Sequence, residues 1–519
     1  MNSYRIGIDV GGTNTDAVLL NQDAQILHSL KTPTTRNVSE GIDTALARLL
    51  KESNVDKKQI HYAMLGTTHC TNAIVERKGL NHIAVIRIGA PATQAIKPLA
   101  GIPQDLKNVL GRYVYLVRGG HEFNGSEIVP LDEKELYRIA HEIKGIVDSV
   151  AVTSVFSPVS KAHEVRAEEI LHEVLGNEIP VSLSHEIGSI GLLERENATI
   201  LNASVINVAK ATAEGFLHAL KNEGIEATVF FSQNDGTLMS IEYTMKYPIF
   251  TIACGPTNSL RGASYLGQKQ NAITVDVGGT TTDVAILTNG FPRESSLAVE
   301  IGGVRTNFRM PDVASIGLGG GTIIRKLENS DEFQVGPDSV GYEITKKALV
   351  FGGDILTATD IAVAAGVADI GDKKAVQHLD KSFVQRVYDK LVDMLELEID
   401  RIKTSSQPVP VILVGGGSII FPEDIKGASE VVKHESGGVA NAIGAAIAQV
   451  SGQIEKVFSL DELGREQTLE LARNLALDEA IKAGAHPESL EIVQLDEVPL
   501  AYLPGNATKI TVKAAGRLK

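Results

Sequence analysis

The sequence predicts an α/β protein of at least two domains, which face each other across a phosphate-binding cleft. Its 519 residues are more than one hydrophobic core usually supports. Strand-like and helix-like segments alternate along most of the chain, as they do in α/β folds. One glycine-rich turn occurs twice, as DVGGTNTD at 9–16 and as DVGGTTTD at 276–283, each time between two strand-like runs. A turn repeated in this way indicates two domains of similar construction.

The composition is typical of an ordinary globular enzyme and disfavours several other classes of protein. Hydrophobic residues make up 43% of the chain and charged residues 22%, and no apolar run reaches the roughly 18 residues of a membrane span. The 2 cysteines fit a reducing compartment and exclude a disulfide scaffold. The net charge of −15 and the absence of Trp disfavour nucleic acid and anionic membranes as partners. We therefore expect a cytoplasmic protein.

The first half of the chain predicts a meander of strands, followed by alternating helices and strands. Strand-like runs occur at 4–10, 17–21, 24–33, 61–66, 82–89, 149–156 and 181–187. Segments with helical spacing of apolar residues occur at 38–53, 131–145, 162–176 and 190–221, the last as one or two long helices. We place the first domain at residues 1–185.

The second half repeats the pattern around the second copy of the turn. A strand is predicted at 227–233, and glycine clusters occur in SIGLGGGTII at 315–324 and in VPVILVGGGSII at 409–420. In the latter, an apolar strand leads directly into three glycines. We place the second domain at 186–455 and a small C-terminal segment, with one helix and some strands, at 456–519.

The repeated turn has the composition of a phosphate-binding loop. Glycine lets the backbone approach a phosphate closely, and successive N–H groups and Thr hydroxyls can donate to its oxygens. One turn from each domain would hold a phosphate chain from both sides. The residues that we expect to contact phosphate are Gly11, Gly12, Thr13, Thr15, Gly278, Gly279, Thr280 and Thr282.

Each copy of the turn begins and ends with an aspartate. Asp9 and Asp276 stand at strand ends, where a carboxylate can hold a hydrated Mg²⁺ that bridges phosphates. Asp16 and Asp283 close the turns, and either can orient the attacking group or accept its proton. The alternative interpretation is that these carboxylates only accept hydrogen bonds from the amides of their own turns.

Two acidic phosphate turns in one chain resemble the superfamily of acetate kinase, sugar kinases, Hsp70 and actin. The resemblance implies two ribonuclease-H-like (actin-like ATPase) domains around a nucleotide cleft, with ATP and Mg²⁺ bound there. The superfamily also has an adenosine motif, a strand followed by glycines, and the segment at 411–420 is similar to it. Its glycines are Gly415, Gly416 and Gly417, and the alternative is a turn that only packs against a helix.

Segments along essentially the whole chain resemble one family within this superfamily, hydantoinase A/5-oxoprolinase. The similar segments, in order, are KTPTT near 31, GTTHCTNAIVERKG at 66–79, SVFSP near 154, ERENATILNASV near 194, SQNDGTLMS near 232, MPDVASIGLGGGTI near 310 and VPLAYLPGNATKI near the end. The resemblance implies an enzyme that couples ATP cleavage to hydrolysis of a cyclic amide, by phosphorylating the amide oxygen, or to carboxylation of a ketone. Members of the family often work with a partner subunit.

The segment at 66–79 supplies uncharged hydrogen-bonding groups suited to a substrate carbonyl or to the γ-phosphate. The residues concerned are Thr67, Thr68, Thr71 and Asn72. The alternative is a turn that closes on its own backbone. The sequence departs from the family at Leu65 and at Ala314, where the family commonly has His.

Several other reactive residues have simpler interpretations. We interpret Cys70 as a packing residue, and His69 either as a base or as a half-buried polar residue. His-Glu pairs occur at 121, 141, 163, 172, 185 and 434. None of them completes His-Glu-x-x-His, so we interpret them as polar residues on helix surfaces and not as zinc ligands.

We therefore expect an ATP-dependent hydrolase of a hydantoin, 5-oxoproline or lactam, with ATP and Mg²⁺ as cofactors. Its partners would be a small-molecule substrate, further copies of the chain and, as in the family, a second hydantoinase-type subunit. A small-molecule kinase or a ketone carboxylase subunit of the same superfamily is the first alternative. A nucleotide-driven actin-like or chaperone-like ATPase is the second. No Gly-Lys dipeptide occurs, which excludes a Walker-type ATPase.

Overall fold

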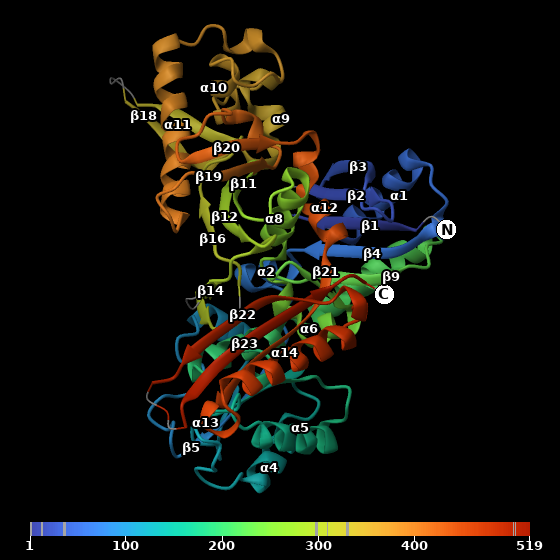
Figure 1. Cartoon of the computed structure of the whole chain (residues 1–519), viewed down its shortest axis with the longest axis vertical. Helices are drawn as coiled ribbons and strands as arrows, with labels where there is room; N and C mark the ends of the chain where they lie inside the picture. The colour runs from blue at the N-terminus through green and yellow to red at the C-terminus, as the bar shows by residue number, and fades with distance from the viewer. Residues whose placement is uncertain are drawn as a thin grey trace.

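A strand–turn–strand hairpin opens the chain and sets the pattern of the first sheet (Figure 1). The computed structural model describes residues 3–11, 14–34, 38–295, 299–308, 310–327, 332–501, 503 and 505–518. β1 (Tyr4–Val10) pairs antiparallel with β2 (Asn14–Leu20), which pairs antiparallel with β3 (Ile26–Pro33). On its other edge, β1 pairs parallel with β4 (Ile60–Thr67), and β4 with β9 (Thr228–Ser232). The strand order is therefore β3-β2-β1-β4-β9.

The second sheet repeats this order. β11 (Ala272–Val277) pairs antiparallel with β12 (Thr282–Thr288), and β12 with β16 (Val313–Ile316). β11 pairs parallel with β19 (Val409–Val414), and β19 with β20 (Ala428–Lys433). The same order and the same directions occur twice, which is the ribonuclease-H-like pattern. The predicted fold class, two such domains in an α/β protein, is confirmed.

Helices cover the outer faces of both sheets. In the first domain, α1 (Val38–Ser53) and the second half of α6 (Leu192–Asn222) pack on β1 and β4, and in the second, α11 (Lys381–Ile402) packs on β11 and β19. The other elements of these domains are α2 (His69–Glu76), β10 (Thr237–Ser240), α7 (Ile241–Lys246), β13 (Phe291–Pro292), β14 (Val299–Ile301), β15 (Val304–Thr306), β17 (Thr322–Lys326), β18 (Phe333–Ser339), α9 (Ile344–Lys347) and α10 (Ala358–Ala364).

A separate parallel sheet is inserted between β4 and β9. Its order is β6-β5-β7-β8, from β5 (Ile83–Ala90), β6 (Tyr113–Arg118), β7 (Ser149–Ser154) and β8 (Val181–Leu183). One face packs on α4 (Glu133–Ile143) and α5 (Ala162–Leu175), and the other on α3 (Gln104–Leu110) and the first half of α6. The region predicted as one or two helices is thus one 31-residue helix, α6, which joins this insert to the first sheet.

The C-terminal strands extend the first sheet (Figure 1). β21 (Gln449–Ser459) pairs with β10, and β23 (Ala507–Gly516) and β22 (Glu491–Pro499) follow, which makes a nine-stranded sheet. α14 (Arg465–Lys482) packs on β21 and β23, after the short α13 (Leu460–Leu463). No helix among the residues that the structure describes is long and apolar enough to cross a membrane.

Two short helices connect the domains and lie between the two sheets. α8 (Cys254–Gly267) leads into the second domain and packs on β11 and β19, whereas α12 (Ala440–Ile447) leads out of it and packs on β1 and β2. A side chain at Gly262 would collide with the Ala440 carbonyl oxygen, and one at Gly444 with the Asn258 carbonyl oxygen. Glycine is needed at this crossing because the two backbones touch.

Candidate active site

The two octapeptides form the same hairpin in the same register. Asp9 lies opposite Asp16, and Asp276 lies opposite Asp283. Gly11 N–H donates to the Asn14 carbonyl at 3.0 Å, and Gly278 N–H to the Thr281 carbonyl at 2.9 Å. Each hairpin therefore presents a pair of aspartates at the mouth of a tight turn. Gly12 and Thr13, predicted to bind phosphate, lie outside the described residues.

Asp9 is held by amides from both connecting helices. Its side chain is 3% exposed. Asn258 of α8 donates from Nδ2 to Asp9 Oδ1 at 2.9 Å, and Asn441 of α12 donates to Oδ2 at 3.3 Å. A side chain at Gly66 would collide with Asp9 Oδ1, so β4 approaches this carboxyl group as closely as glycine allows. Both oxygens of Asp9 are thus fixed in position.

The four aspartates form one electrostatic cluster. Burial raises the pKa of Asp9, and the charge of Asp276 raises it further, against the two amides and Lys31. Burial raises the pKa of Asp16 to about 6, although Lys31 Nζ lies 2.8 Å from its Oδ1. Burial also raises the pKa of Asp276, and it raises that of Asp283 to about 6. Ionising these four carboxyl groups together costs free energy unless a cation is added.

A divalent cation with oxygen ligands fits this donor set. Mg²⁺ prefers carboxylate and water oxygens. Asp9 and Asp276 come from different domains, yet they lie close enough for the charge of Asp276 to raise the pKa of Asp9. Mg²⁺ between them would offset the burial that raises their pKa values.

The three glycines of the predicted adenosine motif lie against the second phosphate turn. Gly417 N–H donates to the Val277 carbonyl at 2.8 Å, and Gly415 has a φ of +84°, which favours glycine. A side chain at Gly415 would collide with Asp276 Oδ1. Gly416 is exposed and has open space where a side chain would be. The structure thus brings 415–417 together with Asp276 and its turn.

The other glycine cluster has a supporting role that the sequence did not reveal. Gly320 N–H donates to the Gly278 carbonyl at 3.0 Å, and Gly321 N–H to the Gly279 carbonyl at 2.7 Å. These bonds satisfy the carbonyl groups of the second phosphate turn. The N–H groups of Gly279 and Thr280 donate to no group in the described part of the chain. They remain available for a phosphate.

Two of the predicted phosphate ligands do not fit that role. Thr15 and Thr282 are fully buried. Thr282 Oγ1 donates to the Leu318 carbonyl at 2.5 Å, and Thr15 Oγ1 lies 3.3 Å from Thr34 Oγ1. Each hydroxyl bonds to the segment that follows the neighbouring strand, β16 or β3. Both face the interior because alternate residues of a strand point to opposite faces of the sheet. Thr280, by contrast, is exposed.

The segment after β4 lies beside the first phosphate turn. Thr68 Oγ1 donates to the Val10 carbonyl at 3.3 Å, and Asn72 Nδ2 donates to Thr68 Oγ1 at 3.3 Å. Thr67 is buried, whereas Thr71 is half-buried and Asn72 is exposed. The alternative interpretation of this segment was a turn that closes on its own backbone, but from His69 onward it forms a helix, α2. Its first residues are therefore placed to reach a ligand held by that turn.

The neighbouring reactive residues are not poised for catalysis. Burial lowers the pKa of His69 to about 4, so the ring is neutral and a weak base near pH 7. Burial raises the pKa of the Cys70 thiol to about 11, which leaves almost no thiolate. Cys70 packs in the hydrophobic core, as the sequence predicts.

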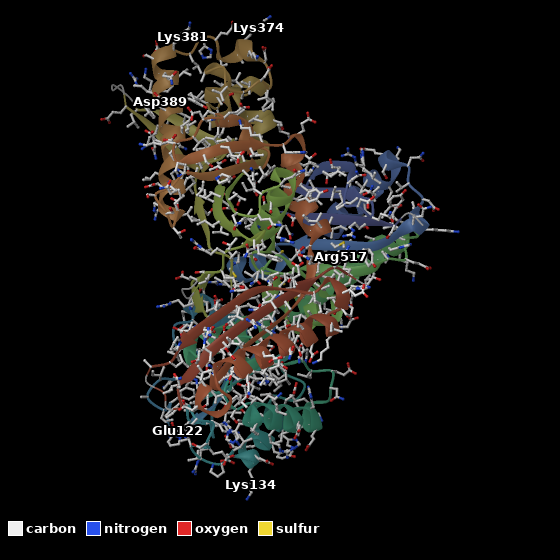
Figure 2. The ribbon with its side chains drawn as sticks, viewed as in Figure 1. Glu122, Lys134, Lys374, Lys381, Asp389 and Arg517 are labelled. Atoms are coloured by element: carbon white, nitrogen blue, oxygen red, sulfur yellow. The ribbon has the colours of Figure 1, made fainter. Side chains whose placement is uncertain are left out.

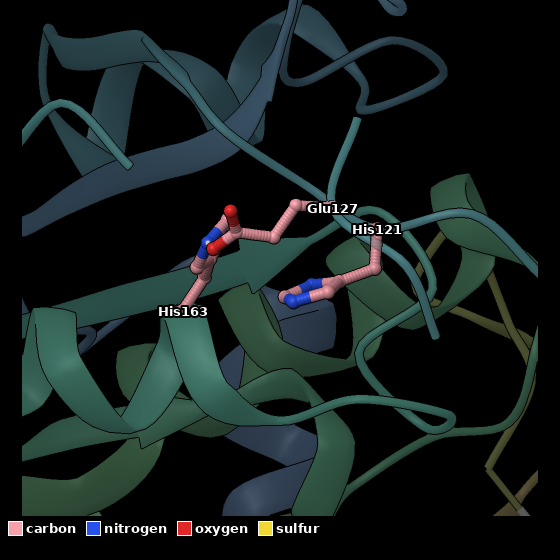
Figure 3. A group of neighbouring side chains, drawn as sticks. All are labelled: His121, Glu127 and His163. Atoms are coloured by element: carbon pink, nitrogen blue, oxygen red, sulfur yellow. Dashed lines mark hydrogen bonds and ion pairs between the residues drawn. The ribbon is translucent and has the colours of Figure 1, made fainter. Parts of the chain in front are cut away.

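The interpretation of the His-Glu pairs as surface residues is wrong for His185, whose side chain is 12% exposed, and also for His121 and His163. His121 and His163 are 3% and 4% exposed, and with Glu127 they form a compact group (Figure 3). Gly120 N–H donates to His163 Nδ1 at 2.9 Å, so the ring proton is on Nε2, which lies 3.0 Å from Glu127 Oε1. A metal at Nε2 would have to displace that proton. We assign His163 and Glu127 to a structural hydrogen-bond network, against which the His121 ring packs at 4.2 Å between ring centroids; the distance between these residues in the sequence concealed the group.

Comparison with known proteins identifies the family. Residues 5–175 match the hydantoinase/oxoprolinase N-terminal region, and residues 195–404 match the hydantoinase/oxoprolinase domain. The chain belongs to the hydantoinase/oxoprolinase family. The resemblance carried by the sequence segments above is therefore confirmed.

Relatives within the family have different activities. The chain is 25% identical to an uncharacterised protein of Methanocaldococcus jannaschii, over 99% of this chain and 82% of that one. It is 28% identical to the acetophenone carboxylase gamma subunit of Aromatoleum aromaticum, over 70% and 53%, and 27% identical to caprolactamase subunit alpha of Pseudomonas jessenii, over 70% and 54%. The matches thus span about half the length of the carboxylase and caprolactamase subunits.

Two solved structures share the fold of the whole chain. ATP-dependent caprolactamase from Pseudomonas jessenii has a TM-score of 0.78 at 19% identity, over 99% of this chain and 88% of that one. The nucleotide-free structure of acetone carboxylase has a TM-score of 0.68 at 18% identity, over 100% of this chain and 88% of that one. The nine-stranded sheet, the insert and the second domain therefore belong to one shared architecture.

Proposed function

We propose that this member of the hydantoinase/oxoprolinase family is an ATP-dependent hydrolase that opens a cyclic amide. The observation that supports it best is the meeting of Asp9 and Asp276, from two hairpins of the same register, in one electrostatic cluster. Two phosphate turns that face each other suit a nucleoside triphosphate.

In this proposal, the free N–H groups of Gly279 and Thr280 donate to the phosphates, and Gly416 faces the adenosine. Asp9 and Asp276 would hold Mg²⁺. When bound, Mg²⁺ supplies the positive charge that neutralises the phosphates. Positioning and charge neutralisation account for most of the catalysis of phosphoryl transfer.

Phosphorylation makes an inert amide reactive. The bond from the γ-phosphorus to the β,γ-bridging oxygen breaks, a bond to the amide oxygen forms, and the amide N–H proton leaves to a carboxylate. Asp16 and Asp283, whose pKa values are raised to about 6, suit the role of this base. Water then adds to the phosphorylated imidate, and the C–N bond breaks to leave an acyl phosphate. A second water releases phosphate, so one turnover yields ADP, phosphate and a ring-opened amino acid.

The proposal is tested by incubating the chain with Mg²⁺–ATP and a panel of hydantoins, 5-oxoproline and lactams. ADP, inorganic phosphate and the ring-opened acid should appear in equal amounts, and Asp276→Asn should abolish all three. Asp389→Asn is the matched control, because Asp389 is exposed on α11 at the far side of the second domain (Figure 2). A stable phosphorylated product would identify a kinase instead. ATP cleavage stimulated by a protein but by no small molecule would identify an actin-like or chaperone-like ATPase.

Ketone carboxylation is the second candidate, because the acetophenone carboxylase gamma subunit is 28% identical over 70% of this chain. The same panel with ketones and bicarbonate distinguishes it, since carboxylation requires bicarbonate and hydrolysis does not. The acetophenone carboxylase and caprolactamase relatives are both named as subunits. We therefore also propose a partner subunit for this chain. ATP binding by the chain without turnover, followed by turnover after a second hydantoinase-type subunit is added, would support that partner.

A further inference from the structure

A cavity of about 730 Å³ lies outside the candidate active site. The insert, the turn after β9, β21 and α14 form its walls, and none of its lining residues belongs to either phosphate turn. On the insert side it is lined by Ser157 and Lys161, which follow β7, and by His185, which follows β8. The cavity therefore lies at the carboxyl ends of parallel strands, where open α/β sheets commonly bind ligands.

Sequence segments that the proposed function leaves unused meet at this cavity. SVFSP at 154–158 contributes Ser157, and SQNDGTLMS at 232–240 contributes Asn234, Asp235 and Met239. Arg195, from the ERENATILNASV segment, lies behind the wall and donates to Ser184 Oγ at 2.9 Å. Three segments that are distant in sequence thus build one wall.

The polar centre of the wall is a buried carboxylate that orients an imidazole. Glu164 is fully buried and accepts from Ser154 N–H at 2.7 Å, from Ser184 Oγ at 2.5 Å and from His185 N–H at 3.0 Å. His185 Nδ1 lies 2.6 Å from Glu164 Oε2, and the ring is 12% exposed. Because the carboxylate only accepts, Nδ1 carries the proton. The opposite edge of the ring, with Nε2, therefore turns away from Glu164.

Basic groups without protein partners line part of this cavity, beside Glu186 Oε2 and Asn307 Oδ1, which are buried without hydrogen bonds to the described residues. His185 Nε2 bonds to no group in the described ranges, and Lys161 and Lys456, both exposed, form no ion pair there. Lys482 and Lys509, which also line the cavity, lie 2.7 Å and 3.5 Å from glutamates. Apolar side chains complete the wall, among them Met239, Phe250 and Phe308.

We propose that this cavity is a second ligand site and that it binds a small carboxylic acid with a short apolar body. The carboxyl group lies against His185 Nε2, and the two groups share one proton between them. Glu164 accepts from Nδ1 on the other side of the ring and so fixes its orientation, and Lys161 adds a positive charge. The apolar body lies against the Met and Phe side chains. The inference does not depend on the reaction at the nucleotide site.

Hexanoate is the probe, with hexanamide as its uncharged counterpart, titrated calorimetrically into the whole chain without nucleotide. Hexanoate should bind, and hexanamide should bind at least about tenfold more weakly, since hydrogen bonds to charged groups contribute about 1.5–3 kcal/mol. His185→Gln and Lys161→Met should each weaken hexanoate binding by a similar factor. Lys134→Met is the matched control, because Lys134 is exposed on α4 at the tip of the insert and should change nothing (Figure 2).

Three results would overturn the proposal. They are no binding of hexanoate, equal binding of hexanamide, and unchanged hexanoate binding in both the His185 and the Lys161 variants. Lys161 is exposed, so its replacement leaves the fold intact even if the His185 variant is destabilised. Asp276→Asn should bind hexanoate as wild type does, which separates this site from the nucleotide site.

Discussion

Replacing Asn258 by Ala removes the hydrogen bond that its Nδ2 donates to Asp9 Oδ1 at 2.9 Å. Asp9 then keeps only the longer bond from Asn441, at 3.3 Å. Burial already raises the pKa of Asp9, and Asn258 is one of the groups that oppose this shift. A hydrogen bond to a charged group contributes about 1.5–3 kcal/mol. If Asp9 holds Mg²⁺ as proposed, Asn258→Ala should therefore weaken Mg²⁺–ATP binding about 10- to 100-fold.

The assay is calorimetric titration of Mg²⁺–ATP at about pH 6 and at about pH 8, with the fold checked by circular dichroism. The loss should be greater at the lower pH, because the variant raises the pKa of Asp9 further and protonation removes the anion that holds the metal. Asn441→Ala should show the same pattern with a smaller loss, since its bond is longer. Ala is the best helix former, so α8 should persist. A folded Asn258→Ala variant that binds Mg²⁺–ATP as wild type does, at both pH values, would refute the reasoning.

Three further predictions concern stability. Burial raises the pKa of Asp283 from 3.8 to about 6, so the protein without nucleotide should lose stability as the pH rises through about 6; Asp283→Asn should reduce this loss, and adding Mg²⁺–ATP to wild type should offset it in thermal melts. Gly444→Ala should lower the melting temperature or prevent folding, because its Cβ would collide with the Asn258 carbonyl oxygen, whereas Gly438→Ala has open space and should melt as wild type does. His163→Ala leaves the Gly120 N–H unpaired and should cost about 1–3 kcal/mol in urea unfolding, while a metal chelator should leave the wild-type curve unchanged.

The sequence was sufficient for the duplicated fold because its strongest signal is local. Each octapeptide contains the glycines of its own turn and the two aspartates that pair across it, at Asp9 and Asp16 and again at Asp276 and Asp283. Alternation of strands and helices then predicts the α/β class without any long-range information. The helical region of α6 was also visible, as one or two helices, because apolar residues recur at helical spacing along its 31 residues.

Long-range contacts could not be predicted in this way. Asn258 and Asn441 are 249 and 432 residues from the carboxylate that they hold, and neither lies in a motif that indicates ligand binding. Thr15 and Thr282 belong to the repeated turn, but their burial depends on which face of each strand meets the core. The pairing of β21 with β10, which joins the C-terminal strands to the first sheet, likewise has no local signature.

The connecting helices add to the site something that duplication alone does not supply. The two hairpins are alike, yet it is Asp9 whose two oxygens accept from Asn258 and Asn441, which stand on the helices that enter and leave the second domain. The backbones of these helices touch at Gly444, so the two amides keep a fixed spacing. In the proposed function, the duplicated turns supply the phosphate contacts, and the connecting helices fix how the carboxylate of the first domain is presented to a ligand held by both.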